Sequence, residues 1–280
     1  MTTKMEIRHN VHPEMAKTLD TEGLRRHFLI SGLFTSDQVT MTYSHVDRLV
    51  ITGVMPVTKA LSLDAPKPIG QDYFFAAREA GIINVGGAGE VSVDGKQFAL
   101  EGNVALYIGK GARDVSLTSQ DAQNPAKFYM VSCPAHKELP AALIDGSRAN
   151  QIKAGAAETC NQRTIHQFLH PDVVETCQLT MGMTHLAAGS VWNTMPAHTH
   201  DRRSEAYLYF NIPSDQRVFH LMGEPQETRH LVVANDEAII SPSWSIHSGA
   251  GTTAYSFIWA MAGDNKNFTD MDHIKIEDLK

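Results

Sequence analysis

The stretch MPAHTHDRRSEAYLYFN, residues 195–211, places two histidines two positions apart and a glutamate soon after them. Residues i and i+2 of a strand point to the same face, so His198 and His200 are expected to converge on one point. The polar turn DRRS, residues 201–204, then resets the register so that Glu205 faces the same point. Polar and apolar residues alternate from Glu205 onward, which is typical of a strand. The stretch therefore predicts a cluster of ligand-type side chains inside a β-rich fold.

A fourth candidate ligand, His247, lies in SPSWSIHSG, residues 241–249, and is expected to reach the cluster from a third strand. Three imidazoles and one carboxylate suit Zn²⁺, Fe²⁺, Mn²⁺, Co²⁺ or Ni²⁺ and leave a position for water or substrate. Because the set contains no thiolate, it favours a catalytic metal over a structural one. A histidine pair alone is usually incidental in a β protein. The spaced glutamate and the later Pro-x4-His pattern favour the metal site.

Short runs of β-branched and aromatic residues, separated by Gly, Pro, Asp and Asn, dominate the chain from about residue 38. Many short strands with turns between them indicate a β-sandwich or barrel. The segment VSVDGKQFAL, residues 91–100, has an Asp-Gly turn between strand-like flanks and predicts a hairpin. Residues 12–31 contain the one convincing helical start, with Asp20 or Thr21 as its cap.

The two halves of the sequence resemble each other. Glu79 begins EAGIINVG and Glu205 begins EAYLYFNI, while residues 102–116 and residues 235–249 share a pattern of strand, turn and polar residue. These parallels favour two copies of one β-barrel, of which only the second keeps the histidines. The alternative is chance similarity between β-rich segments.

The domain organisation follows from this duplication. We expect an N-terminal barrel without metal ligands in residues 1–150 and a metal-binding barrel in residues 151–280. Residues 134–164 are Ala-rich and polar and lack a strand period, so they are interpreted as a connection between the domains.

Composition narrows the class of protein. The chain has 280 residues, a net charge of -7 and no basic patch, which argues against binding nucleic acid. Its three cysteines are odd in number and form no Cys-x-x-Cys pair, so a reducing compartment fits best. The N-terminus lacks the apolar core of a signal peptide, and no run of about 18 apolar residues predicts a membrane span. We therefore expect a cytoplasmic, enzyme-sized protein.

The ligand pattern H-x-H-x4-E followed by P-x4-H resembles the metal-binding motifs of the cupin superfamily, whose fold is the double-stranded β-helix or jelly-roll barrel. Trp244 and Ile212 stand where cupins usually have Gly, which affects turn geometry more than the ligands. A set of longer segments, in this order, resembles the 5-keto-4-deoxyuronate isomerases: YSHVDRLVITGVMPVTK, NVGGAGEVSVDG, ALYIGKGA, FLHPDVVETCQLTMGMT, WNTMPAHTHDRRSEAYLYFN, MGEPQETRHLVV and SPSWSIHSGAGTTAYSFIWAMAGDN. The likeness covers nearly the whole chain and is weakest in residues 135–162.

This resemblance implies an all-β bicupin with a short N-terminal helical segment, a homohexamer that contains zinc. The family's ligands fall on His198, His200, Glu205 and His247. The implied activity is that of a zinc-dependent ketol-isomerase in pectin breakdown, which converts 5-keto-4-deoxyuronate to 3-deoxy-D-glycero-2,5-hexodiulosonate. A bound metal would polarise the carbonyl and stabilise an enediolate while an acid-base group moves the proton. A hydride shift is the competing route, and the sequence does not separate the two.

Candidates for the remaining roles come from position and charge. Tyr207 and Tyr209 share the face of Glu205 and are expected to line the cavity, with plain aromatic packing as the alternative. Glu227 is a weaker acid-base candidate. A guanidinium suits the carboxylate of a uronate. The candidates are Arg163, Arg229, Arg203 and Arg202. Arg202 and Arg203 lie in the turn beside the ligands, and the alternative for one of them is a solvated surface charge.

Two other functions fit the same ligands. An Fe²⁺-dependent cupin dioxygenase uses similar ligands for O₂ chemistry, and a colourless zinc protein without O₂ uptake would exclude it. A non-catalytic sugar-binding cupin would bind its ligand equally well after metal removal. The sequence shows no helix-turn-helix segment, which counts against a transcription regulator.

Overall fold

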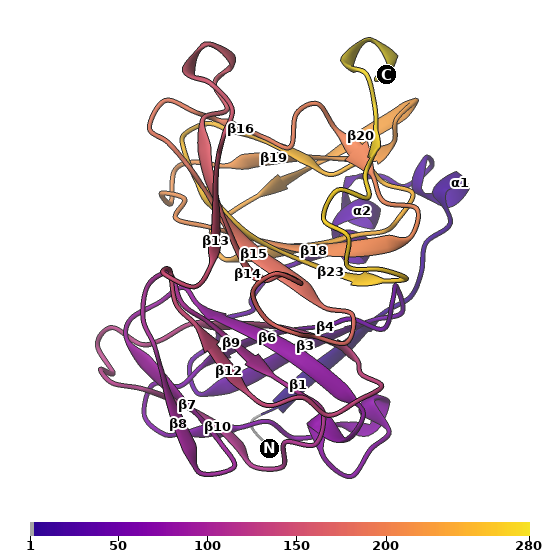
Figure 1. Cartoon of the computed structure of the whole chain (residues 1–280). Helices are drawn as coiled ribbons and strands as arrows, with labels where there is room; N and C mark the ends of the chain where they lie inside the picture. The colour runs from indigo at the N-terminus through magenta and orange to yellow at the C-terminus, as the bar shows by residue number, and fades with distance from the viewer. Residues whose placement is uncertain (1–2) are drawn as a thin grey trace. The chain divides into compact units, whose positions relative to one another are not determined.

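The computed structural model describes residues 3–280 and consists mainly of β-strands (Figure 1). The described strands form two seven-stranded sheets, two four-stranded sheets and one two-stranded sheet. Two short helices, α1 (Pro13–Ala16) and α2 (Thr21–Phe28), lie near the N-terminus. The expected all-β fold with a short N-terminal helical segment is thus confirmed. Within the described residues, no helix is long and apolar enough to cross a membrane.

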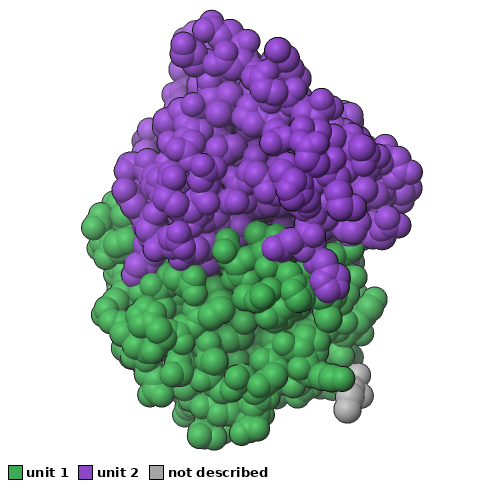
Figure 2. All heavy atoms as spheres, turned by 90° about the vertical axis from the view of Figure 1, so that its right-hand side faces the viewer, with its two compact units in different colours: residues 1–8, 32–150, 168–181 green, residues 9–31, 151–167, 182–280 purple. Residues whose placement is uncertain are grey.

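The chain divides into two compact units, which Figure 2 colours separately. Unit 1 contains the described part of residues 1–8 together with residues 32–150 and 168–181. Unit 2 contains residues 9–31, 151–167 and 182–280, so the N-terminal helices belong to it. The assignment of the two expected domains as barrels with and without metal ligands stays a prediction.

Unit 1 consists of one large and one small sheet. The order of strands in the large sheet is β1 (Thr3–Arg8), β3 (Gln38–Ser44), β4 (Val50–Met55), β11 (Phe128–Pro134), β6 (Arg78–Asn84), β9 (Ala105–Ile108) and β12 (Ala142–Ile144). The order in the small sheet is β5 (Leu61–Ser62), β10 (Val115–Ser119), β7 (Gly89–Val93) and β8 (Lys96–Leu100).

Unit 2 repeats this pattern. The order of strands in its large sheet is β13 (Asn150–Ala154), β14 (Arg163–Leu169), β15 (Thr180–Leu186), β23 (Ser256–Gly263), β18 (Arg203–Phe210), β21 (Glu237–Ser241) and β2 (Leu29–Ile30). The order in its small sheet is β16 (Trp192–Asn193), β22 (Ser248–Gly251), β19 (Val218–Glu224) and β20 (Glu227–Val233). A two-stranded sheet pairs β17 (His198–Thr199) with β24 (Asp272–His273). Single turns of 3-10 helix lie at Lys67–Ile69, Phe74–Ala76, Ala157–Thr159 and Ile276–Asp278.

The two strand orders match position by position, which supports the interpretation of an internal duplication. In the large sheets β6 corresponds to β18, and these strands carry Glu79 and Glu205. Likewise β9 corresponds to β21, as expected from the similarity between residues 102–116 and 235–249.

Local sequence signals explain the elements predicted best. The Asp20 side chain accepts a hydrogen bond of 2.7 Å from the backbone N–H of Gly23 and caps α2, as expected. Asp94 and Gly95, between β7 and β8, have φ values of 49° and 84°. A two-residue turn with positive φ at both positions matches the twist of a hairpin, and Asp-Gly is favoured there. The predicted hairpin is confirmed.

The expectation that residues 134–164 lack strands was wrong in part. They contain β12, which pairs with β9, and β13, which forms the edge of the large sheet of unit 2. All residues of β13 except the last are exposed. Because neither face of this strand is buried, its sequence does not alternate between apolar and polar residues. A strand of three residues such as β12 is too short to show a period.

The core of unit 1 surrounds buried polar side chains, among them the carboxylate of Glu79 and the guanidinium of Arg78. This core is mainly aliphatic, with members such as Val39, Ile82 and Leu106. Glu79, on β6, is fully buried and accepts hydrogen bonds from the backbone N–H groups of residues 177–179 at 2.7–2.9 Å. The Tyr107 hydroxyl donates a further bond of 2.7 Å. Glu79 therefore anchors a loop within unit 1.

This anchor gives a prediction for stability. Glu79→Ala leaves the N–H groups of residues 177–179 and the buried Tyr107 hydroxyl without their acceptor. A buried group left in this way costs about 1–3 kcal/mol. We expect the free energy of unfolding to fall by more than about 3 kcal/mol, measured by urea denaturation. Glu101→Ala, at an exposed position of unit 1, should change it by less than about 0.5 kcal/mol. Equal midpoints for the two variants would contradict the anchoring role.

Candidate metal centre

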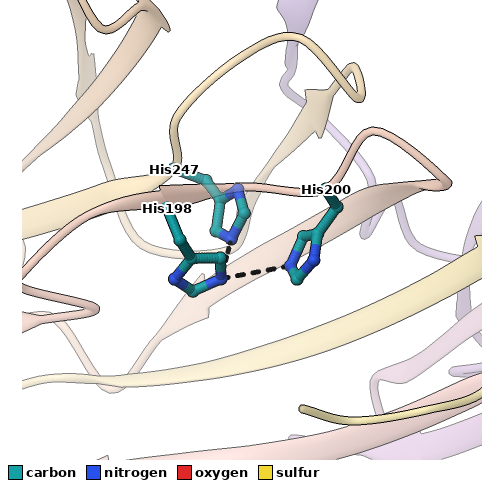
Figure 3. A group of neighbouring side chains, drawn as sticks. All are labelled: His198, His200 and His247. Atoms are coloured by element: carbon teal, nitrogen blue, oxygen red, sulfur yellow. Dashed lines mark hydrogen bonds between the residues drawn. The ribbon is translucent and has the colours of Figure 1, made fainter. Parts of the chain in front are cut away.

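The four predicted ligands come from three places in unit 2. His198 lies on β17, and His200 follows one residue beyond that strand. Glu205 is the third residue of β18, and His247 directly precedes β22. All four side chains are buried, and the three imidazole rings point toward one another (Figure 3). The structure therefore brings together the residues that strand spacing predicted.

The ligand atoms are in direct contact. The Nε2 atom of His198 is 3.1 Å from Nε2 of His200 and 2.9 Å from Nε2 of His247. The Oε2 atom of Glu205 is 3.1 Å from Nε2 of His247 and 3.5 Å from Nε2 of His200. Metal–ligand bonds of about 2.0–2.2 Å place neighbouring ligand atoms about 2.9–3.5 Å apart. The cluster therefore has the dimensions of a coordination sphere.

The protonation state of the cluster also suits a metal. Burial lowers the pKa of His198 to about 3, and the neighbouring His200 adds to this effect. Burial also holds the pKa of His247 well below its usual value, although a hydrogen bond with the backbone of Ser245 acts in the opposite direction. A lowered pKa keeps an imidazole neutral at pH 7, which is the form that binds metals.

One atom of the cluster lacks a partner. Oε2 of Glu205 is buried and receives no hydrogen bond, and an unsatisfied buried carboxylate oxygen is costly. A divalent cation between this oxygen and the three Nε2 atoms would satisfy it. Among residues 3–280, His198, His200 and His247 are the one group of three His, Cys, Asp or Glu side chains close enough to hold a metal ion.

The cluster forms one wall of a cavity of ≈ 280 Å³. This volume is close to the lower end of the range for ligand pockets, about 300–1,000 Å³, and suits a molecule the size of a sugar. The other polar residues that line it are Arg163, Thr184, Thr194, Tyr207 and His273. The apolar residues that line it are Ile165, Met195, Pro196, Phe257, Trp259, Met261, Phe268 and Met271.

The two predicted tyrosines differ in position. Tyr207 lines the cavity, whereas Tyr209 is not among its lining residues. The hydroxyl of Tyr209 instead lies 2.7 Å from Nδ1 of His220, a fully buried histidine. Burial raises the pKa of Tyr207 well above 10, and the Glu205 carboxylate adds to the shift, so its hydroxyl stays protonated and can donate a hydrogen bond.

The three predicted arginines also differ. Arg163 is the only Lys or Arg among the described residues that line the cavity. Arg203 lies outside the lining and is 1% exposed, so it is not a surface charge; its Nη2 donates to the carbonyl of Asp270 at 2.7 Å. The guanidinium of Arg229 donates to the carbonyls of Ala16, Lys17 and Leu19 and so ties the helical segment to β20.

Glu227, predicted as an acid-base group, does not line this cavity. It is exposed at the start of β20 and borders a separate hollow, which also includes Lys17, Glu224 and His273. His273 borders both hollows. Polar neighbours in the sequence made Glu227 a candidate, but they did not indicate which face of the sheet its side chain occupies.

Sequence reasoning missed two groups of cavity residues. Phe257, Trp259 and Met261 alternate along β23, so the period of that strand could have placed them on one inner face. Phe268, Met271 and His273 follow β23 in a segment with little regular structure. No periodic signal marks that segment, and only its tertiary contacts place it at the cavity.

The fold and the ligand cluster define a two-barrel protein of cupin type with a site able to hold a metal. The model of the KduI/IolB family matches residues 28–276, and the chain belongs to this family. The expected resemblance to the 5-keto-4-deoxyuronate isomerases is confirmed.

Proteins from two organisms illustrate the relationship. The chain is 53% identical over 278 residues to the 4-deoxy-L-threo-5-hexosulose-uronate ketol-isomerase of Dickeya dadantii (strain 3937), covering 99% of this chain and 100% of the relative. It is 51% identical, with the same coverage, to the ketol-isomerase of that name from Escherichia coli (strain SMS-3-5 / SECEC).

Solved structures support the fold. An IolB-like protein from Salmonella typhimurium LT2 matches with a TM-score of 0.67 and 18% identity, covering 81% of this chain and 87% of that chain. Oxalate decarboxylase from Bacillus subtilis matches with a TM-score of 0.52 and 10% identity, covering 78% of this chain and 69% of that one. At these identities the likeness concerns the fold alone.

The ligand assignment gives a prediction for metal content. His198→Ala or His247→Ala removes one donor from the cluster, so each purified variant should lose its metal on dialysis yet keep a folded barrel. Elemental analysis measures the metal, and far-ultraviolet circular dichroism checks the fold. His230→Ala, at an exposed position of β20, is the control and should keep the parental metal content. Parental metal content in both cluster variants would refute the assignment.

Proposed function

We propose that this chain is a metal-dependent ketol-isomerase that converts 5-keto-4-deoxyuronate, also called 4-deoxy-L-threo-5-hexosulose uronate, to 3-deoxy-D-glycero-2,5-hexodiulosonate in pectin and uronate catabolism. The observation that carries the proposal is the buried cluster of three imidazoles and one carboxylate, which lines a cavity of sugar size containing one guanidinium. Relatives that are 51–53% identical over the whole chain carry the name of this activity.

The proposed ligands are His198, His200, Glu205 and His247, with Zn²⁺ as the metal. Zn²⁺ binds imidazole and carboxylate donors and undergoes no redox change, which suits a reaction that only relocates hydrogen within the substrate. When bound, the ion supplies Lewis acidity toward the oxygens of the substrate. We place the enzyme in the cytoplasm, as a homohexamer.

Arg163 is proposed to bind the carboxylate of the substrate. Its guanidinium lies at the cavity and donates to the carbonyl of Asn161 at 2.9 Å through Nη1, which fixes its direction and leaves its other N–H groups available. Burial lowers the pKa of Arg163, but an arginine remains charged at neutral pH. A charge-assisted bond to one end of the substrate would orient the other end toward the ligand cluster.

Tyr207 is proposed to donate a hydrogen bond, or a proton, to an oxygen of the substrate. It lines the cavity beside Glu205, and its raised pKa keeps the phenol protonated. The apolar side chains Phe257, Trp259 and Met261 exclude water from the same space, which strengthens such a bond.

The test of the proposed activity is a proton NMR time course with 5-keto-4-deoxyuronate and either the intact protein or the protein after chelation. Conversion to the 2,5-diketo acid by the intact protein, lost on chelation and restored by Zn²⁺, is the expected result. Absence of conversion by metal-replete protein would overturn the proposal.

Arg163→Gln should weaken the use of a carboxylate substrate. A hydrogen bond to a charged group is worth about 1.5–3 kcal/mol, so kcat/KM should fall about 10- to 100-fold, mainly through KM. Steady-state kinetics measures the change, and Arg26→Gln, at an exposed position of α2, should leave both constants at the parental values. An unchanged KM for Arg163→Gln would exclude the carboxylate-binding role.

The pair Tyr207→Phe and Tyr209→Phe separates a cavity donor from a packing residue. Loss of a proton donor costs about 10²–10⁴-fold, so kcat should fall at least about 100-fold for Tyr207→Phe with metal content unchanged. Tyr209→Phe removes the partner of His220 and should reduce stability by about 1–3 kcal/mol, with kcat within about tenfold of the parent. Equal losses of kcat in both variants would contradict this division.

A further inference from the structure

The C-terminal strap, defined here as residues 264–280, is fastened to unit 2 by backbone hydrogen bonds. Within it, β24 pairs with β17, so that His273 lies opposite His198. The backbone N–H of Ile274 donates to the carbonyl of Ala197 at 3.0 Å, and that of Lys280 donates to the carbonyl of Pro225 at 3.0 Å. The strap thus runs directly alongside a strand that carries a candidate ligand.

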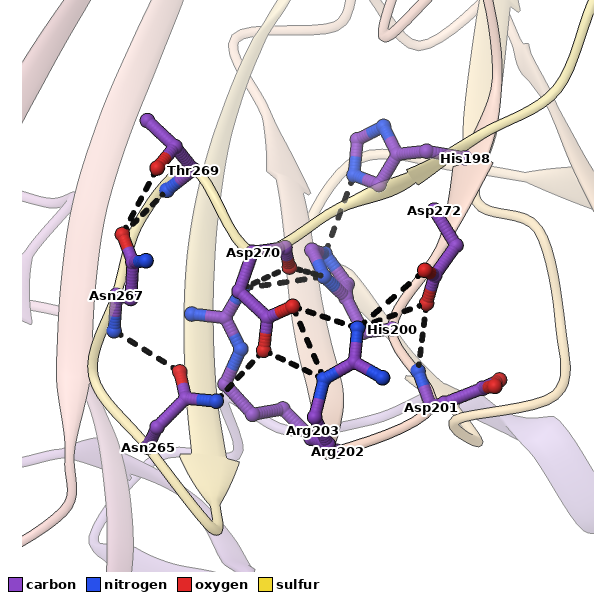
Figure 4. Close-up of polar contacts among 10 residues, drawn as sticks. All are labelled: His198, His200, Asp201, Arg202, Arg203, Asn265, Asn267, Thr269, Asp270 and Asp272. Carbon is purple, nitrogen blue, oxygen red and sulfur yellow. Dashed lines mark hydrogen bonds and ion pairs between the residues drawn. The ribbon is translucent and has the colours of Figure 1, made fainter.

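A forked ion pair holds the strap at a second place (Figure 4). Nε of Arg202 donates to both carboxylate oxygens of Asp270, at 2.8 and 3.0 Å, and its Nη2 donates to Oδ1 at 2.6 Å. Asn265 donates to the same carboxylate at 2.6 Å. Isolated ion pairs at a surface contribute little, but a forked pair within a network fixes geometry. The Arg202–Asp270 fork therefore fixes the backbone at residue 270.

The backbone carbonyl of Asp270 reaches the ligand cluster. It lies 3.0 Å from Nδ1 of His200. A carbonyl only accepts hydrogen bonds, so this contact requires a proton on Nδ1 and leaves the lone pair on Nε2, which faces the other ligands. A bond of this kind to the outer nitrogen is the usual way in which a protein fixes the orientation of a metal-binding imidazole.

Arg203 completes the arrangement. Its Nη2 donates to the same carbonyl at 2.7 Å and lies 3.2 Å from Nδ1 of His200. Nη2 of Arg203 and Nδ1 of His200 both donate to the Asp270 carbonyl, so they lie close to each other. This shared acceptor accounts for the distance of 3.2 Å between them. If Nδ1 instead accepted from Arg203, the proton would sit on Nε2 and His200 could not bind a metal.

We propose that the Arg202–Asp270 fork is a positioning device for the metal ligand His200, because it places the Asp270 carbonyl that sets the tautomer and orientation of the imidazole. The inference rests on the metal centre of the proposed function. It gives Arg202, an exposed residue outside the cavity lining, a role in metal affinity.

The experiment measures the affinity for Co²⁺, whose visible d–d absorption reports both occupancy and coordination geometry. Metal-free protein is titrated with Co²⁺ in the presence of a competing chelator, for the parent, Arg202→Ala, Arg202→Lys, Asp270→Asn and Glu277→Ala. The control, Glu277→Ala, removes an exposed ion pair with Lys275 in the same strap. Thermal unfolding of each metal-free variant records any change in stability separately.

The expected result is a Co²⁺ affinity about tenfold weaker for Arg202→Ala, together with an altered absorption spectrum, since loss of such outer contacts costs about 10–100-fold. Arg202→Lys, which keeps the charge without the fork, and Asp270→Asn, which keeps the shape, should lie between this variant and the parent. Glu277→Ala should match the parent. If Arg202→Ala does not fold, Asp270→Asn decides the matter by the same comparison.

If the folded Arg202→Ala variant has the parental Co²⁺ affinity and absorption spectrum, the inference is overturned, whatever its melting temperature. That result would not contradict the assignment of the metal centre. Failure of the parent protein to bind Co²⁺ or Zn²⁺ at all would overturn the metal centre itself and the inference with it. The two failures are therefore distinguishable.

Discussion

Three buried imidazoles and one buried carboxylate meet inside unit 2. The structure around them depends on which partners their nitrogen and oxygen atoms have. Burial keeps His198 and His247 uncharged, so neither supplies a full positive charge to Glu205, whose Oε2 atom has no hydrogen-bond donor. Unpaired buried polar atoms are costly, and a divalent cation held by the three imidazoles and the carboxylate would satisfy this oxygen. The turn before β18, the start of β22 and the strap each contribute to this meeting point.

The two units have the same order of strands, but they surround a buried glutamate with different partners. Glu79 and Glu205 occupy corresponding strands, and both are buried. In unit 1 the carboxylate accepts three backbone N–H groups and a tyrosine hydroxyl, and the surrounding core is aliphatic. In unit 2 the corresponding carboxylate faces imidazoles and an aromatic cavity. The carboxylate is thus satisfied by hydrogen bonds in unit 1, while in unit 2 it borders a cavity.

The sequence predicted the features that depend on short-range order. The spacing of His198, His200 and Glu205 follows from strand geometry, and the hairpin at residues 91–100 follows from the conformational preferences of Asp-Gly. Features that depend on tertiary contacts could not be read in this way. Arg229 binds the carbonyls of the helical segment more than 200 residues away, and β13 lacks an apolar period because it is an exposed edge strand. The contact between the Asp270 carbonyl of the strap and His200 joins residues that are 70 positions apart in the sequence, so it depends on the tertiary fold.

We infer that His198, His200, Glu205 and His247 together form one coordination sphere. A crystal structure of the purified protein, with anomalous diffraction recorded at the absorption edge of its metal, tests this most directly. We expect a single anomalous peak in unit 2, about 2.0–2.2 Å from Nε2 of His198, His200 and His247 and from an oxygen of Glu205. A stoichiometric metal bound elsewhere, with these side chains linked only by hydrogen bonds or water, would contradict it.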